Sequence, residues 1–182
     1  MGLPSCAVGS NDDQRCGSMT AGPGFGLTAL WRPSPYFALG GTFTWLNFAF
    51  RPTQGSGFEH GTANGHFWGL LGRVYFFDHG PVEPYLELGM GSAAVGTSAR
   101  EQGDEYRESS AGLAFRVGGA IEFSLSRHVR LGPAYDWTRF NAEAVRRCGQ
   151  ARCFDLDDAS YGRATGFSSV SLRLSVQLGP GS

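Results

Sequence analysis

The sequence predicts an all-β fold, specifically an up-and-down antiparallel transmembrane β-barrel, on three observations. Apolar and polar residues alternate with a period of two in seven segments, as in strands with two different faces. No run of about 18 apolar residues encodes a transmembrane helix. Only 17% of the residues are charged, whereas 13% are aromatic and 28 are glycine. Average soluble domains contain about 25% charged residues, so this composition favours an outer surface that faces something other than water.

The predicted strands are joined by connections that alternate in length. The strands cover residues 22–31, 36–45, 66–77, 83–96, 112–124, 128–140 and 167–178. Short turns are expected at 32–35, 78–82 and 125–127. Long polar loops are expected at 51–65, 97–111 and 141–166. Short turns at one end and long loops at the other are typical of outer-membrane barrels, whose turns face the periplasm.

The two faces of these strands differ in both size and charge. Bulky apolar side chains share one face and are predicted to point outward: Phe25, Leu27, Trp45, Trp68, Leu70, Leu86, Leu88, Phe115, Val117, Tyr135, Trp137, Leu172 and Leu174. Small residues share the other face with seven charged residues, which form the predicted lumen network: Arg73, Glu87, Arg116, Glu122, Arg130, Asp136 and Arg173. A barrel of about eight strands has room inside only for side chains, so the small, polar face suits the interior.

Symmetric hairpins would place opposite charges of this network face to face. A turn centred on Gly80 would pair Arg73 with Glu87. A turn centred on Ser126 would give two further pairs, Arg116–Asp136 and Glu122–Arg130. Buried charge is costly unless it is paired, so these matches predict a neutralised and largely closed lumen. The alternative interpretation is that they are solvated surface pairs.

The four cysteines form two close pairs in the sequence. Three connectivities are open, and local pairing favours disulfides Cys6–Cys16 and Cys148–Cys153, both in loops at the extracellular end. Zinc binding is the alternative, but no CxxC motif supports it. Disulfides indicate an oxidising compartment outside the cytoplasm.

The sequence divides into an extracellular loop with a disulfide (1–20), a β-barrel domain (21–179) and a C-terminal tail (180–182). Seven strands are visible, although bacterial single-chain barrels have even numbers, so we expect eight strands with the first one missing from this chain. The alternatives are a seven-stranded barrel, a strand complement from another chain, or a strand within 3–8. The N-terminus contains no apolar segment, so a signal peptide is absent from this chain.

Two segments resemble a known family. VEPYLELGMG at 82–91 resembles the opening of the fourth strand in OmpA-like and OmpX-like β-barrels, and FRVGGAIEF at 115–123 resembles the following strand. The resemblance covers about residues 22–178. It implies a transmembrane domain in the outer membrane of a Gram-negative bacterium, exported through the periplasm. The chain departs from these families at its end, because Leu178 is followed by GPGS rather than by a terminal aromatic residue.

The predicted function is that of a structural envelope protein, or of a barrel whose surface loops bind an unknown extracellular partner. The alternative is a narrow channel for small or hydrophobic solutes, and a lipid-modifying barrel enzyme is the third hypothesis. We expect no catalytic residue and no cofactor, because the histidines stand beside no nucleophile: His60, His66, His79 and His128.

Metal ions and nucleic acid are not expected as ligands. The acidic residues of the loops lack the glycine-centred EF-hand pattern: Asp104, Glu105, Asp155, Asp157 and Asp158. The net charge of −1 indicates no basic surface for binding nucleic acid. The expected partners are membrane lipid and an unknown extracellular molecule that the loops bind.

Overall fold

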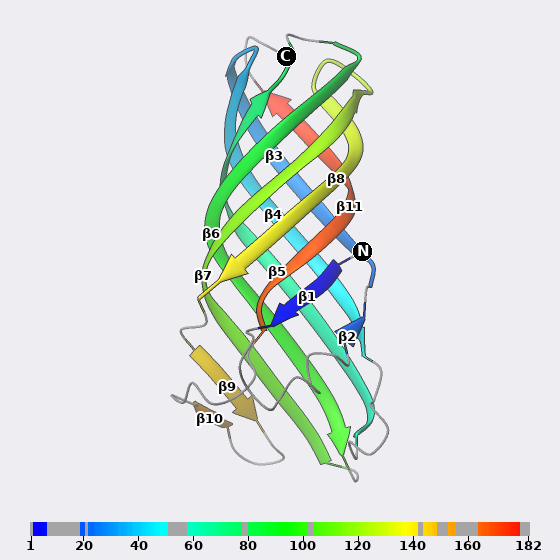
Figure 1. Ribbon diagram of the computed structural model, residues 1–182, viewed down its shortest axis with the longest axis vertical. Helices are drawn as coiled ribbons and strands as arrows, with labels where there is room; N and C mark the ends of the chain where they lie inside the picture. The colour runs from blue at the N-terminus through cyan, green and yellow to red at the C-terminus, as the bar shows by residue number, and fades with distance from the viewer. Residues whose placement is uncertain are drawn as a thin grey trace.

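A computed structural model of the chain forms a tall β-barrel (Figure 1). It describes residues 2–6, 19–20, 22–50, 58–77, 80–101, 104–141, 144–148, 153–155 and 164–178. The strands within these residues are β1 (Gly2–Cys6), β2 (Met19–Thr20), β3 (Gly24–Ser34), β4 (Phe37–Phe50), β5 (Phe58–Tyr75), β6 (Val82–Glu101), β7 (Asp104–Ser124), β8 (Val129–Phe140), β9 (Ala144–Cys148), β10 (Cys153–Asp155) and β11 (Ala164–Leu178). In this described part of the chain, no helix is long and apolar enough to cross a membrane.

Seven long strands close the barrel. Strands β3 to β8 pair in sequence as antiparallel neighbours, and β8 pairs with β11 in the same way. The wall closes through β11 and β3, which run parallel. When an odd number of strands alternates in direction, the first and the last must point the same way. The prediction of a purely antiparallel barrel is therefore wrong at this one junction, and seven rather than eight strands close the wall within the described residues.

The strands β5, β6 and β7 extend further than the sequence predicts. Strand β5 starts at Phe58, β6 ends at Glu101, and β7 starts at Asp104. The expected long loop at 97–111 is thus wrong, because residues 97–101 and 104–111 belong to the paired strands β6 and β7. Both faces of this hairpin are polar here, so the alternation that marks a strand in the sequence is missing.

Short additional strands pair with the barrel strands toward the end opposite the short turns. Strand β1 lies within the segment 1–20 that the sequence predicts as a loop, and it pairs antiparallel with β11. Strand β9 pairs with β7 beyond the end of β8, and β10 pairs with β9. The predicted disulfide Cys148–Cys153 joins these two strands, with a Cα–Cα distance of 4.0 Å. The other predicted bridge involves Cys16, which lies outside the described residues.

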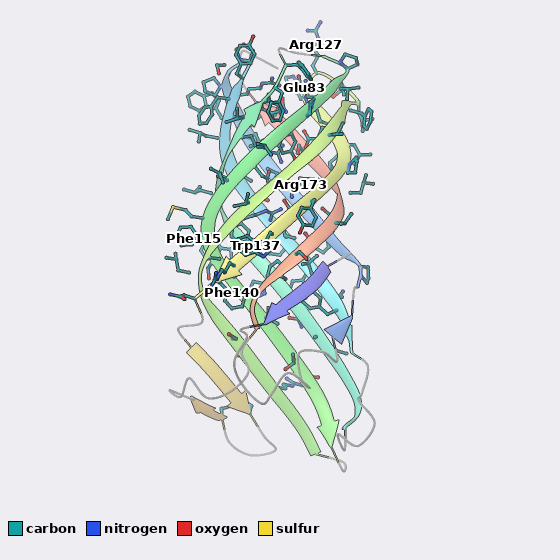
Figure 2. All side chains as sticks on the ribbon, viewed as in Figure 1. Glu83, Phe115, Arg127, Trp137, Phe140 and Arg173 are labelled. Carbon is teal, nitrogen blue, oxygen red and sulfur yellow. A yellow bond between two sulfur atoms is a disulfide. The ribbon has the colours of Figure 1, made fainter. Side chains whose placement is uncertain are left out.

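The predicted outward direction of the apolar side chains is confirmed. Of the thirteen apolar residues expected to point outward, all but Trp45 are exposed; Leu70 is 71% exposed and Leu88 is 68% exposed. Trp45 is half-buried because its indole stacks on the imidazole of His66, with ring centroids 6.0 Å apart. Figure 2 shows Phe115 on the outside of the wall.

Candidate functional site: the charged barrel interior

The predicted lumen residues all lie inside the barrel. Each of the seven charged side chains is at most 4% exposed. The structure adds two buried charges that the sequence analysis did not select, Arg32 and Glu83, both 0% exposed. The described interior therefore holds five arginines against four carboxylates: Arg32, Arg73, Arg116, Arg130 and Arg173 against Glu83, Glu87, Glu122 and Asp136.

A first cluster lies near the short turns, at the end where Glu83 appears in Figure 2. Arg32 donates to Oε2 of Glu83 at 2.7 Å, and Arg130 forms an ion pair with the same oxygen at 3.0 Å. The guanidinium of Arg32 also lies over the ring of Tyr75, 3.9 Å from its centroid. Gln177 donates to the Tyr75 hydroxyl at 2.9 Å. Two arginines thus share one carboxylate here.

A second cluster is centred on Arg73. Its Nε donates to Glu87 at 3.0 Å, and its Nη1 donates to Glu122 at 3.1 Å and to the Ser175 hydroxyl at 3.0 Å. The Tyr85 hydroxyl donates to the same oxygen of Glu122, also at 3.1 Å. Residues from four strands are therefore joined through one guanidinium.

A third cluster continues from the second through Glu87. Oε1 of Glu87 forms ion pairs with Arg116 at 3.2 Å and with Arg173 at 2.7 Å. Both arginines also contact Asp136, with 2.7 Å between Arg116 and Asp136. Arg116 donates to the Thr44 hydroxyl on the opposite side of the interior at 2.7 Å. This network of bonds joins β4, β6, β7, β8 and β11 across the barrel.

Two of the three predicted charge pairs are present, but only one has the predicted register. Arg73 lies directly opposite Glu87, as expected for a turn centred on Gly80. In the β7–β8 hairpin the register is shifted by two residues, because the turn is centred on Arg127 rather than on Ser126. A shift of two keeps every side chain on its predicted face.

This shift explains the contacts of Asp136 and Arg130. Gly118 lies opposite Asp136, and a Cβ at Gly118 would be only 2.3 Å from Oδ1 of Asp136. The glycine thus leaves room for the carboxylate, which reaches Arg116 diagonally. Arg130 lies opposite Ser124 instead of Glu122 and binds Glu83. The predicted Glu122–Arg130 pair is therefore wrong.

The alternation along the strands could have identified the two missed charges. Arg32 continues the inward positions of β3, which include Thr28 and Leu30, although the sequence analysis assigned it to a turn. Glu83 precedes Tyr85 and Glu87 with the same two-residue spacing.

An apolar layer fills the interior toward the long-loop end. Its members are Leu46, Phe48, Ala63, Phe67, Ala93, Val95, Ala114, Phe140 and Phe167. The guanidinium of Arg116 lies 5.3 Å from the ring centroid of Phe67, where the ionic and apolar regions meet. The interior is thus filled by two stacked regions of different chemistry.

The outer face carries an apolar belt on all seven barrel strands. Every outward residue in this belt is apolar over nine residues of each strand, or eleven in β7: 25–33, 37–45, 68–76, 82–90, 113–123, 129–137 and 170–178. Exposed aromatic residues gather near the short turns, among them Trp31, Tyr36, Phe76, Phe77 and Phe123. A second group lies toward the long-loop end, with Phe25, Phe43, Trp68, Phe115 and Trp137.

The belt ends abruptly on the extended strands β5, β6 and β7. Beyond it, the described outward residues include no further large apolar side chain. A pocket of about 490 Å³ lies in this region, lined by Thr62, Asn64, Gly96, Thr97, Ser98, Arg107, Ser109 and Cys148. Arg139 marks the same boundary on β8, where it is exposed and opposite Phe115.

The other candidate residues are not gathered into a site. His128 lies at a turn, where its Nδ1 is 3.3 Å from the carbonyl oxygen of Gln177. His60 lies in β5 rather than in a loop, and His79 falls outside the described residues. Asp157 and Asp158 also fall outside them, as do the side chains of Asp104, Glu105 and Asp155. Among the described side chains, no group of three or more metal-ligating residues comes together.

Comparisons with known proteins identify no family. No model of a known protein family matches the chain, and no curated protein sequence is significantly similar to it. The resemblance to OmpA-like and OmpX-like proteins is thus supported only as architecture: the chain is an all-β protein that forms a closed seven-stranded barrel.

Proposed function

We propose that this protein is an integral β-barrel of a bacterial outer membrane, with a closed lumen and with loops displayed at one end. The observation that carries the proposal is the apolar belt, which is free of charge on all seven strands over nine to eleven residues. A transmembrane β-strand needs about 9–11 residues to cross the hydrocarbon core. Aromatic residues near both ends of the belt fit the two interfacial girdles of such barrels.

The alternative of a soluble barrel requires the opposite distribution of side chains. Soluble monomers rarely expose apolar patches larger than a few hundred Å². Here large apolar side chains are exposed around the whole wall, while nine charged residues of the described strands are buried inside it. In water, both features would be unfavourable. In lipid, the outer face needs no hydration, and the paired interior needs no solvent.

The filled interior supports a structural or loop-displaying role. The largest side chains in the interior include four arginines, two tyrosines and Phe67, each less than 2% exposed. The polar outer pocket beyond the belt lies where a partner outside the membrane would approach. We include in this proposal OmpA-like membership and no enzymatic activity, with membrane lipid as one partner and an unidentified extracellular molecule as the other.

The second candidate function is a narrow channel. The ionic network favours it, because polar groups line the interior from Arg32 at the short-turn end to Arg116. The apolar layer around Phe67 and Phe167 argues against it, since ions would have to pass between buried rings.

Reconstitution into lipid vesicles tests both candidates. We expect the protein to resist extraction by alkaline carbonate and to give no stepwise conductance in planar bilayers. Extraction with the peripheral proteins would contradict the membrane assignment. Reproducible conductance steps, with the membrane assignment intact, would favour the channel.

A further inference from the structure

The junction between β3 and β11, here called the seam, differs from every other junction of the barrel wall. It is parallel, and its register covers only six pairs, from Arg173–Gly26 to Leu178–Trp31. On its other edge, β11 forms eleven antiparallel pairs with β8. Parallel pairing is slightly less stable per residue than antiparallel pairing. The seam is therefore the weakest junction that closes the barrel.

Strand β1 shares this edge of β11 with β3. Its register runs from Cys6 opposite Ala164 to Gly2 opposite Ser169. The β3 register begins further along β11, at Arg173. Strands β1 and β3 thus pair with successive parts of the same edge of β11. In Figure 1, β1 is the dark blue arrow beside the orange part of β11.

The direction of β1 is the critical observation. Because β1 is antiparallel to β11, a strand extended backward from Gly2 would pass residues 170–178 of β11. It would run between β11 and β3 and be antiparallel to both. The stretch 170–178 is also the apolar belt of β11, and its nine residues match the length of a transmembrane strand.

We propose that the seam is an insertion site for one further β-strand, which enters in line with β1. Insertion would replace the parallel junction by two antiparallel ones, giving the even strand number that is typical of bacterial single-chain barrels. The inference rests on the proposed membrane function in one respect. If the barrel lies in lipid, the outward side chains of the inserted strand must be apolar.

The inward chemistry of the inserted strand follows from its neighbours. The inward residues beside the seam are Gly26, Thr28 and Leu30 on β3, and Arg173, Ser175 and Gln177 on β11. Among the described residues, the interior holds five arginines and four carboxylates, and Arg32 and Arg130 share Glu83. The strand that fits is therefore apolar at alternate positions and small or acidic at the positions between them.

A cysteine cross-link across the seam tests this inference. Leu27 and Leu174 are partners in the parallel register, and both point outward. In the full chain, the double variant Leu27→Cys/Leu174→Cys should form an intramolecular disulfide in detergent. We would then add nine residues in front of Gly2, in an alternating apolar and small pattern. A control extension has the same composition, with its apolar residues clustered.

The alternating extension should abolish the cross-link, whereas the control extension should leave it intact. A cross-link that persists with the alternating extension would overturn the inference. So would a loss with both extensions, because insertion must depend on the pattern. The assay works in detergent, so its failure is distinguishable from failure of the membrane assignment, which vesicle extraction reports separately.

Discussion

The outer face and the interior of this barrel are formed by the same strands but follow opposite rules. Outward residues of the belt are apolar and uncharged, while the described inward residues include nine buried charges in three clusters, two of which share Glu87. Neighbouring residues such as Leu86 and Glu87 therefore meet different environments, one exposed and one 1% exposed. The difference teaches that charge is tolerated inside because it is paired, while the absence of charge outside is what the proposed lipid environment requires.

Removal of one interior carboxylate should have the largest effect. Glu87 binds Arg73, Arg116 and Arg173, so Glu87→Ala would leave three buried guanidinium groups short of a partner. Breaking a buried ion pair by deleting one partner costs about 3–5 kcal/mol. Urea unfolding in lipid vesicles should show a loss of this size. An unchanged midpoint would mean that the interior is hydrated.

A charge placed on the outer belt should cost somewhat less. Leu86 is exposed at the centre of the belt on β6, so Leu86→Arg should destabilise the barrel in vesicles by about 2–4 kcal/mol. The matched control is Ser98→Arg, which is also outward on β6 but lies beyond the belt. Its expected cost is about 0–1 kcal/mol. Equal effects of the two variants would contradict the belt boundary.

A methyl group added inside should have the smallest effect of the three. In Gly118→Ala, the new Cβ would displace the carboxylate of Asp136 from its position beside Arg116. Overpacking of this kind typically costs about 1–3 kcal/mol. The control is Gly41→Ala on the outer face, where the nearest atom would be 3.8 Å away. That variant should unfold at the same urea concentration as the natural protein, or slightly higher.

The alternation in the sequence predicts both faces of the barrel, because side chains in a strand point to opposite sides at every second residue. It could not predict the β7–β8 register, since a two-residue shift leaves the same residues inside and the choice depends on space for Asp136 beside Gly118. It also missed the extension of β6 and β7, where both faces are polar. The parallel seam depends on how the ends of the wall meet, which no local pattern encodes.

The central claim, that the belt lies in lipid, is tested most directly by tryptophan fluorescence. All four tryptophans are on the outer face: Trp31, Trp45, Trp68 and Trp137. They lie toward the ends of the belt, so lipids brominated near the headgroups should quench their emission more strongly than lipids brominated near the bilayer centre. Aqueous iodide should quench them little. Strong quenching by iodide, with none by either brominated lipid, would contradict the account.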